Sequence, residues 1–139
     1  MRRFTGSTPR KEVHFTGAIG SFTVDDAASA RQFYGTTLGL EVKDALPGRP
    51  DPIWLRAGDG PGVFVYVKRD HVPPGFTVLN LSVDDIEQAV DDLAARGISI
   101  ARYDAIPQDE RGIFHGEGHS IAWFTDPAGN NLSVVKLTS

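Results

Sequence analysis

Two histidines and a glutamate lie close together in the sequence, at His115, Glu117 and His119, with a glycine between each pair. Imidazole nitrogens and carboxylates are common ligands of divalent metals. An imidazole that titrates near neutral pH can also act as a general base or hydrogen-bond a ligand. A glycine-rich loop does not bring positions i and i+4 to one side, as a helix would. We therefore predict a loop without a metal ion, in which His115 is a candidate ligand-binding residue; the alternative for both histidines is a structural or solvated role.

Other acidic residues lie at the starts of predicted helices, where they have a structural role. Asp25, Asp84 and Asp85 precede stretches with helical spacing of apolar residues. We predict that Asp25 and Asp84 cap free backbone N–H groups of the two helices, and that the carboxylates near each helix start meet the positive end of the helix dipole. Arg111 follows two acidic residues, which predicts a solvated turn or, alternatively, a cation that closes over an anionic ligand. No nucleophile with an activating base is visible, so the catalytic residues stay unknown.

The helical stretches belong to two copies of one unit, about 60 residues apart. Residues 22–26 open the first copy and residues 81–85 the second. Each copy passes from alternating residues to a helix that ends at a glycine, Gly39 or Gly97, and then to strand-like runs. The pattern predicts an α+β fold of two βαβββ modules, with curved mixed sheets around a cleft.

Turn-forming residues give the predicted boundaries. We expect a flexible N-terminal extension over 1–14, a first module over 15–68, a linker over 69–75 and a second module over 76–139, together one compact domain. The polar segment 104–119 is expected to be a long loop that covers the cleft, and His71 in the linker a surface residue. The predicted strands cover residues 15–24, 40–42, 53–57, 63–68, 78–83, 98–103, 120–125 and 131–137.

Composition excludes several classes of partner. The 139 residues are 40% hydrophobic and 23% charged, with a formal net charge of −4. Without clustered Lys and Arg, no binding to nucleic acid is expected. No run reaches the roughly 18 apolar residues of a membrane span, and the first residues lack the apolar stretch of a secretion signal, so we expect a cytoplasmic protein and no membrane partner. The absence of cysteine excludes disulfides and thiolate chemistry.

The sequence resembles the vicinal oxygen chelate superfamily, also called the glyoxalase, bleomycin resistance protein and dioxygenase superfamily. The resemblance rests on Phe33-Tyr34 with residues 38–40, on residues 83–86 and above all on the Asp-Pro-Ala-Gly-Asn segment at 126–130, and it covers residues 17–137. It implies two modules that pair their sheets around a cleft, and a homodimer. In many members it also implies a divalent ion held by His or Glu on the cleft strands.

The positions to which the resemblance assigns metal ligands hold other residue types here. Counting from the motifs places them at Ile19, Val78 and Ser133, and at Phe64 or Val65 depending on the register. Hydrocarbon side chains have no lone pair, and one hydroxyl cannot hold a divalent ion that needs several nitrogen or carboxylate donors. We therefore expect no metal and no other cofactor.

Strand alternation predicts which side chains line the cleft. Aromatic rings and neutral hydrogen-bonding groups dominate, a composition that suits a flat organic molecule. The leading hypothesis is a metal-independent protein that binds a planar small molecule without chemistry. The alternatives are a superfamily enzyme, such as a lyase, isomerase or dioxygenase, with an unrecognised metal site, and a scaffold with a vestigial cleft. The predicted ligand-binding residues are Ser21, Thr23, Trp54, Arg56, Phe64, Tyr66, Asn80, Ser82, His115, Asn131 and Ser133.

Overall fold

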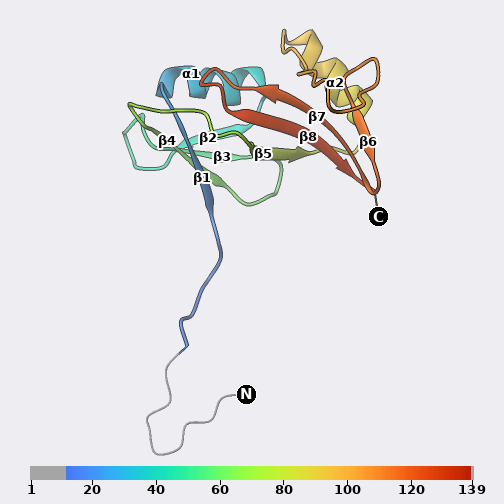
Figure 1. Ribbon diagram of the computed structural model, residues 1–139. Coiled ribbons are helices and arrows are strands. Elements are labelled where there is room, and N and C mark those ends of the chain that lie inside the picture. The colour runs from blue at the N-terminus through green and yellow to red at the C-terminus, as the bar shows by residue number, and fades with distance from the viewer. Residues whose placement is uncertain (1–11, 139) are drawn as a thin grey trace, which may run out of the picture.

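The computed structural model describes residues 12–138 and folds them into two four-stranded sheets, each with a helical segment packed on it (Figure 1). The predicted flexible extension over 1–14 falls mostly on residues 1–11, which lie outside the described part of the chain. Within residues 12–138, no helix has the length and apolar character needed to cross a membrane.

The first sheet has the strand order β1-β4-β3-β2. The neighbours β1 and β4 run parallel, and the other two pairs are antiparallel, so the sheet is mixed as predicted. A helical crossover connects β1 to β2, and its second half widens into a π-helical turn, η1. The elements are β1 (Gly20–Val24), α1 (Ala27–Arg31), η1 (Gln32–Thr37), β2 (Glu41–Asp44), β3 (Ile53–Arg56) and β4 (Val63–Val67).

The second sheet repeats this plan with the order β5-β8-β7-β6. Again the first and last strands of the unit, β5 and β8, are parallel neighbours, and the remaining pairs are antiparallel. The predicted α+β class and the βαβββ order of both modules are therefore confirmed. The elements are β5 (Thr77–Ser82), α2 (Ile86–Ala95), β6 (Phe114–Gly116), β7 (His119–Thr125) and β8 (Asn131–Leu137).

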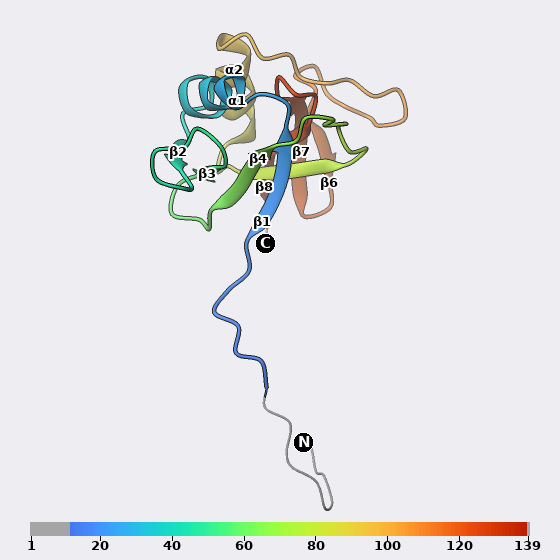
Figure 2. The same cartoon turned by 90° about the vertical axis from the view of Figure 1, so that its left-hand side faces the viewer.

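Three local predictions are wrong. Residues 98–103 form no strand and touch β7 through the bond from Ala101 N to Trp123 O, 2.8 Å. The edge strand of the second sheet is instead β6, inside the predicted loop, because Gly118 adopts a φ of 74° and closes a tight hairpin with β7. The first strand begins only at Gly20, and residues 12–19 run away from the sheet (Figure 2).

The helix caps lie one residue later than predicted. Asp26, not Asp25, accepts a hydrogen bond from Ser29 N at 2.7 Å, and Asp85, not Asp84, accepts one from Gln88 N at 3.0 Å. The mechanism is the predicted one, because each carboxylate satisfies a free N–H of the first helical turn. Hydrophobic spacing locates a helix well but leaves the choice between two adjacent aspartates open.

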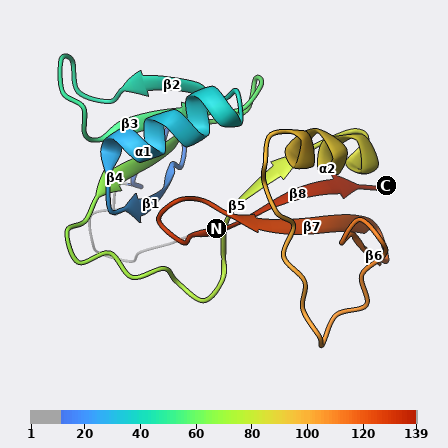
Figure 3. The same ribbon diagram turned by 90° about the horizontal axis from the view of Figure 1, so that it is seen from above.

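The helices α1 and α2 lie on the same side of the molecule, each over its own sheet (Figure 3). Alternate strand residues, such as Phe22, Leu55 and Val65 in the first sheet and Phe124 in the second, are buried in the core on this side. Each sheet therefore has a helix-covered face and a face without a helix. We call the latter face of the first sheet its open face.

A buried polar network connects the two modules. The hydroxyl of Tyr34 in η1 donates a hydrogen bond to Asp126 Oδ2 at 2.6 Å, and the side-chain amide of Asn130 donates to the same oxygen at 3.0 Å and to Thr23 O at 2.8 Å. Both Asp126 and Asn130 belong to the turn between β7 and β8, and Thr23 belongs to β1. The Asp-Pro-Ala-Gly-Asn segment thus joins the second module to the first.

Candidate functional site

The open face of the first sheet brings together six of the predicted ligand-binding residues. The parallel register places Ser21 opposite Phe64 and Thr23 opposite Tyr66, and β3 places Trp54 opposite Phe64. Partners in register project to the same side of a sheet. The residues between them along each strand are buried under α1, so the side chains that face away from the helix are the predicted ones. The six residues are Ser21, Thr23, Trp54, Arg56, Phe64 and Tyr66.

Aromatic side chains dominate this face and are accessible on it. The rings of Trp54 and Phe64 meet edge to face, with centroids 5.2 Å apart and an interplanar angle of 86°. Phe64 is 37% exposed and Tyr66 is 44% exposed. A Cβ added at Gly62 would come within 2.1 Å of Trp54 Cε2, so this glycine makes room for the indole. A flat ligand would find an aromatic wall already ordered by its own ring contacts.

A hollow of about 570 Å³ is lined by one of these rings, Tyr66. We call it the open-face hollow. Ser21, Thr23 and Tyr66 line it from the first sheet, and the linker and the start of β5 supply the opposite wall. Its polar groups are hydroxyls, one buried amide and one ion pair, Lys68 Nζ to Asp70 Oδ1 at 2.6 Å. The full lining is Ser21, Phe22, Thr23, Tyr66, Lys68, Asp70, Val72, Pro74, Phe76, Thr77, Val78 and Asn130.

The linker contributes more to this hollow than its sequence suggests. The prediction that His71 is a surface residue is wrong, because its Nδ1 lies 2.6 Å from Thr23 Oγ1 and its Nε2 is buried without a partner among the described residues. The hydrogen bond from Lys68 lowers the pKa of Asp70, so this carboxylate stays ionised at neutral pH. One signal in the sequence does indicate this wall: two prolines force the linker to stay extended beside the end of β4.

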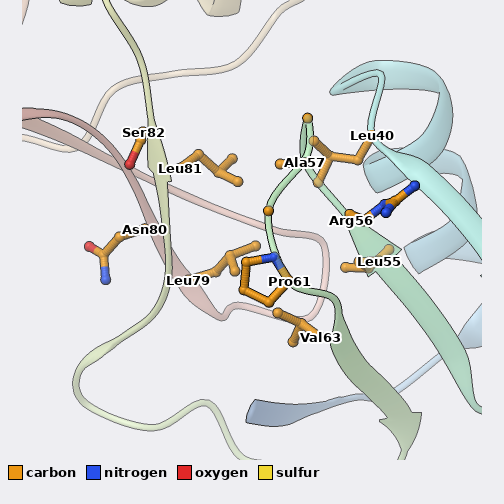
Figure 4. A pocket seen from close by; sticks show the side chains of 12 residues that line it. Leu40, Leu55, Arg56, Ala57, Pro61, Val63, Leu79, Asn80, Leu81 and Ser82 are labelled. Atoms are coloured by element: carbon orange, nitrogen blue, oxygen red, sulfur yellow. The ribbon is translucent and has the colours of Figure 1, made fainter. Parts of the chain in front are cut away.

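A second hollow, of about 470 Å³, lies between the modules and is apolar (Figure 4). Leu79 and Leu81 of β5 point into it, toward Leu55, Pro61 and Val63. Three predicted ligand-binding residues, Arg56, Asn80 and Ser82, also line this hollow. The polar ends of their side chains point away from its centre (Figure 4), and Arg56 Nε donates to Glu41 Oε1 at 2.9 Å. The hollow between the modules therefore includes three of the predicted polar residues, while leucine, valine and proline side chains make up most of its wall.

Two predicted residues are covered in the second sheet. Ser133 has no exposed surface and donates a hydrogen bond to Asn80 Oδ1 at 2.6 Å. Asn131 lies opposite Thr77 in the register, and its Oδ1 is buried without a partner among the described residues. Neither side chain lines one of the two hollows, so the structure does not bring them together with the open face.

His115 lies on the hairpin of β6 and β7, away from both hollows. Its Nε2 lies 2.8 Å from Asp109 Oδ2 and its Nδ1 3.2 Å from Ser120 Oγ. His119 instead contacts Glu117 O, 3.0 Å from its Nδ1, so the two imidazoles do not converge on one ion. His115 and Asp109 form a structural pair that holds the segment before β6.

The segment 104–119 does not cover either hollow, contrary to expectation. Arg111 forms a two-pronged ion pair with Asp91 of α2, 3.0 Å from Nε to Oδ1 and 3.2 Å from Nη2 to Oδ2. Because its guanidinium already has a carboxylate partner on α2, Arg111 does not close over an anionic ligand. The segment is fixed to the helix side of the second module.

The residues at the expected metal positions do not fit a divalent cation. Ile19 is 59% exposed, Val65 lies in the core, and the Ser133 hydroxyl is already engaged by Asn80. Val78 lines the open-face hollow with hydrocarbon only. Within residues 12–138 no group of three or more His, Asp or Glu side chains is placed to hold a metal ion. The donor set required for coordination is thus not provided by the described residues.

Comparison with known proteins gives consistent matches along most of the chain. A model of the Glyoxalase/Bleomycin resistance protein/Dioxygenase superfamily matches residues 13–134. TnmS3, an antibiotic binding protein from Streptomyces sp. CB03234, is similar in structure, with a TM-score of 0.62 and 23% identity over 90% of this chain and 100% of that chain. A search of curated proteins gives no match.

Two further solved structures share the fold. One is a member of the same superfamily from Sphaerobacter thermophilus DSM 20745, with a TM-score of 0.61 and 25% identity over 86% of this chain and 97% of that chain. The other is a glyoxalase family protein from Enterococcus faecalis, with a TM-score of 0.61 and 20% identity over 90% of this chain and 97% of that chain.

Proposed function

Because the chain belongs to the glyoxalase/bleomycin resistance protein/dioxygenase superfamily, we propose that it is a small-molecule binding protein that holds a planar organic ligand on the open face of the first sheet. In this proposal the ligand stacks on Tyr66 and on the pair of Trp54 and Phe64, and one end enters the open-face hollow. The mechanism is burial and stacking without bond chemistry.

The observation that carries the proposal is the aromatic wall beside a hollow of about 570 Å³. Ligand sites of drug-sized molecules are typically hollows of this size with apolar walls and few polar groups. The Ser21 and Thr23 side chains offer neutral hydrogen-bonding groups at the rim. The relative TnmS3 is described as an antibiotic binding protein, which supports a binding role for this fold.

Metal independence is supported by the residue types around the hollow. Val78, at a position where the superfamily resemblance implies a ligand, contributes only methyl groups. The one ionisable pair that lines the hollow, Lys68 and Asp70, is mutually neutralised. Such a site attracts neither a bare cation nor a strongly charged substrate, and it favours a neutral ligand.

We further propose that the protein acts as a homodimer. The open face offers a ligand only one wall, whereas bound drug-sized ligands are usually buried on most of their surface. Phe64 and Tyr66 leave a large apolar area in water, which is typical of an interaction surface. A second copy of the chain would supply the missing wall.

Native mass spectrometry of the untagged protein tests this proposal, because it detects small molecules that co-purify with the intact chain. The proposal expects one bound organic molecule per chain, released unchanged on denaturation. The released compound is then returned to the protein in tenfold excess. Conversion of more than one equivalent into product would show an enzyme and contradict the proposal.

A further inference from the structure

Asn130, in the turn between β7 and β8, carries a buried oxygen atom without a partner. Its side chain has no exposed surface, and its Oδ1 has no hydrogen-bond partner within residues 12–138. Nearly all buried polar atoms of folded proteins are paired, because an unpaired one keeps the full cost of its desolvation. An acceptor of this kind beside a hollow is therefore a candidate for recognition of a donor group.

The orientation of this amide is fixed by its other hydrogen bonds. Asn130 Nδ2 donates to Thr23 O at 2.8 Å and to Asp126 Oδ2 at 3.0 Å. Both partners accept hydrogen bonds, so the oxygen end of the amide cannot take the place of the nitrogen. The backbone N–H donates to Asp126 Oδ1 at 2.8 Å, and the backbone carbonyl accepts from Asp126 N at 3.0 Å. Oδ1 is therefore the one polar atom of Asn130 that has no hydrogen bond.

This oxygen belongs to the open-face hollow, because Asn130 is part of its lining. The other polar atoms of the residue are engaged by Thr23 and Asp126, so Oδ1 is the group that Asn130 can offer to a ligand. Two further buried side-chain atoms of the described residues are unpaired, His71 Nε2 and Asn131 Oδ1. Neither of these residues lines the hollow.

The remaining polar side chains of the hollow discriminate less between ligands. Ser21 is exposed, so water satisfies its hydroxyl when no ligand is bound. Thr23 Oγ1 already lies 2.6 Å from His71 Nδ1, and Asp70 is bonded to Lys68. Exchange of water for a ligand group at an exposed site changes the free energy little, whereas a buried acceptor gains a partner that it otherwise lacks. The buried amide oxygen therefore selects most strongly.

We propose that Asn130 determines the specificity of the open-face site, where Oδ1 accepts a hydrogen bond from an N–H or O–H group at the end of the ligand that enters the hollow. This inference rests on the proposed function and names the ligand class: neutral planar molecules with a donor at one edge, such as phenols, aromatic amines and lactams. The flat part of the ligand lies between Tyr66 and Phe76, which line the hollow and are 44% and 65% exposed.

A panel of flat bicyclic compounds in matched pairs tests the selection. In each pair an O–H or NH₂ group of one member is replaced by a methyl group in the other, as in 2-naphthol and 2-methylnaphthalene. The methyl compound is similar in size and more hydrophobic, so a purely apolar site would prefer it. We expect the donor member to bind at least about tenfold tighter, because the methyl member leaves the buried acceptor unpaired. Titration of the full-length protein, followed by NMR, measures both affinities.

The side chain of Asn130 reports the bond directly in protein labelled with 13C and 15N. Its Cγ signal should move downfield with the donor members and stay in place with the methyl members. Asn130→Ala removes the oxygen and should reduce the preference to about twofold or less, provided that circular dichroism shows an intact fold. The Cγ signal of the wild type decides the matter irrespective of this variant.

Ser21→Ala is the matched control, because it removes an exposed hydroxyl from the same hollow. We expect this variant to keep the preference for the donor member. A preference lost in Ser21→Ala would assign the selection to that hydroxyl and overturn the role of Asn130.

The ring signals of Tyr66 separate failure of this inference from failure of the proposed function. Equal affinities within the pairs, or a donor preference that leaves the Asn130 Cγ signal in place, would overturn the inference. If the Tyr66 signals shift in these cases, stacking on the open face still stands. If no member of the panel shifts the signals of Tyr66 or Asn130, both the proposed ligand binding and the inference fail.

Discussion

Tyr34 in η1 donates a hydrogen bond of 2.6 Å to Asp126 in the turn before β8. Tyr34 has no exposed surface, and Asp126 is 5% exposed. A buried carboxylate requires such donors, and Asp126 also accepts from Ala128 N at 2.9 Å and Asn130 N at 2.8 Å. The bond ties the helix of one module to a turn of the other, so it fixes how the two modules sit together.

Tyr34→Phe should destabilise the fold by about 2 kcal/mol, because it removes one hydrogen bond to a buried charged group. Urea unfolding followed by circular dichroism measures the change. Tyr103→Phe is the matched control, since Tyr103 is 37% exposed and packs edge to face on Trp123. A loss of less than about 0.5 kcal/mol in Tyr34→Phe would contradict the role of this bond.

The bond between Tyr34 and Asp126 also predicts how the stability of the fold changes at alkaline pH. Burial, and then the charge and hydrogen bond of Asp126, raise the pKa of Tyr34 above its ordinary value. A group with a raised folded-state pKa contributes stability that is complete below its unfolded pKa, about 10, and is lost as the pH rises further. The stability difference between wild type and Tyr34→Phe should therefore shrink above about pH 10. A constant difference would contradict this.

Gly62→Ala should disturb the aromatic wall of the open face. The new methyl group would meet Trp54 within 2.1 Å. Overpacking of this kind typically costs about 1–3 kcal/mol, and the indole must turn away from Phe64. Trp fluorescence should shift and ligand binding weaken by at least about tenfold. Gly20→Ala in the same sheet meets no atom within 4 Å and serves as the control.

Asp109→Ala should open the segment before β6. The carboxylate accepts hydrogen bonds from Arg111 N and Ile113 N, both 2.9 Å, and contacts His115. Hydrogen exchange of residues 102–113 should accelerate by at least about tenfold, because these bonds close the loop. Glu110→Ala, an adjacent carboxylate, should leave the exchange unchanged.

Hydrogen exchange measured at acid pH tests the role of the Asp109 carboxylate in a second way. Burial opposes ionisation of Asp109, but the hydrogen bonds from His115, Ile113 N and Arg111 N outweigh it and lower the pKa. A depressed pKa contributes stability above the unfolded value, about 3.9, which is lost as the pH falls through the folded value. The difference in exchange between wild type and Asp109→Ala should thus shrink below about pH 4. Persistence of the full difference there would count against the carboxylate.

Tyr66→Ala should weaken ligand binding by at least about tenfold without loss of the fold, because it removes a stacking ring that is already 44% exposed. Titration calorimetry with the co-purified ligand measures this. Ser133→Ala is the informative comparison. Its hydroxyl is engaged by Asn80, so the variant should lose about 1 kcal/mol of stability while affinity stays the same. The reverse pattern would move the site to the second sheet.

The alternation of side chains along the strands was the most accurate basis for predicting which residues share a face of the sheet. Alternation alone placed Ser21, Trp54 and Tyr66 on one face, because the core side of each strand is apolar and the period is two. The Asp-Pro-Ala-Gly-Asn segment predicted the fold, although its structural task, the bond to Tyr34, involves a residue far away in sequence. Contacts of this range leave no local pattern.

Other features could not be found by periodicity. Residues 98–103 look like a strand because Ile98 and Ile100 recur at a spacing of two, yet the strand that pairs with the edge of β7, at His119–Ile121, is β6, in the hairpin closed by Gly118. The ion pair of Arg111 with Asp91 and the contact of His71 with Thr23 join segments that no spacing rule relates. These tertiary contacts decide that the long loop lies on α2 and the linker lines the hollow.

Ligand binding after exhaustive removal of metal ions tests the central claim most directly. The protein is dialysed against EDTA, its metal content is measured by inductively coupled plasma mass spectrometry, and the co-purified ligand is titrated into it by calorimetry. We predict one ligand per chain with an affinity within about twofold of the untreated protein. A stoichiometric transition metal before dialysis, together with loss of binding after it, would contradict the account.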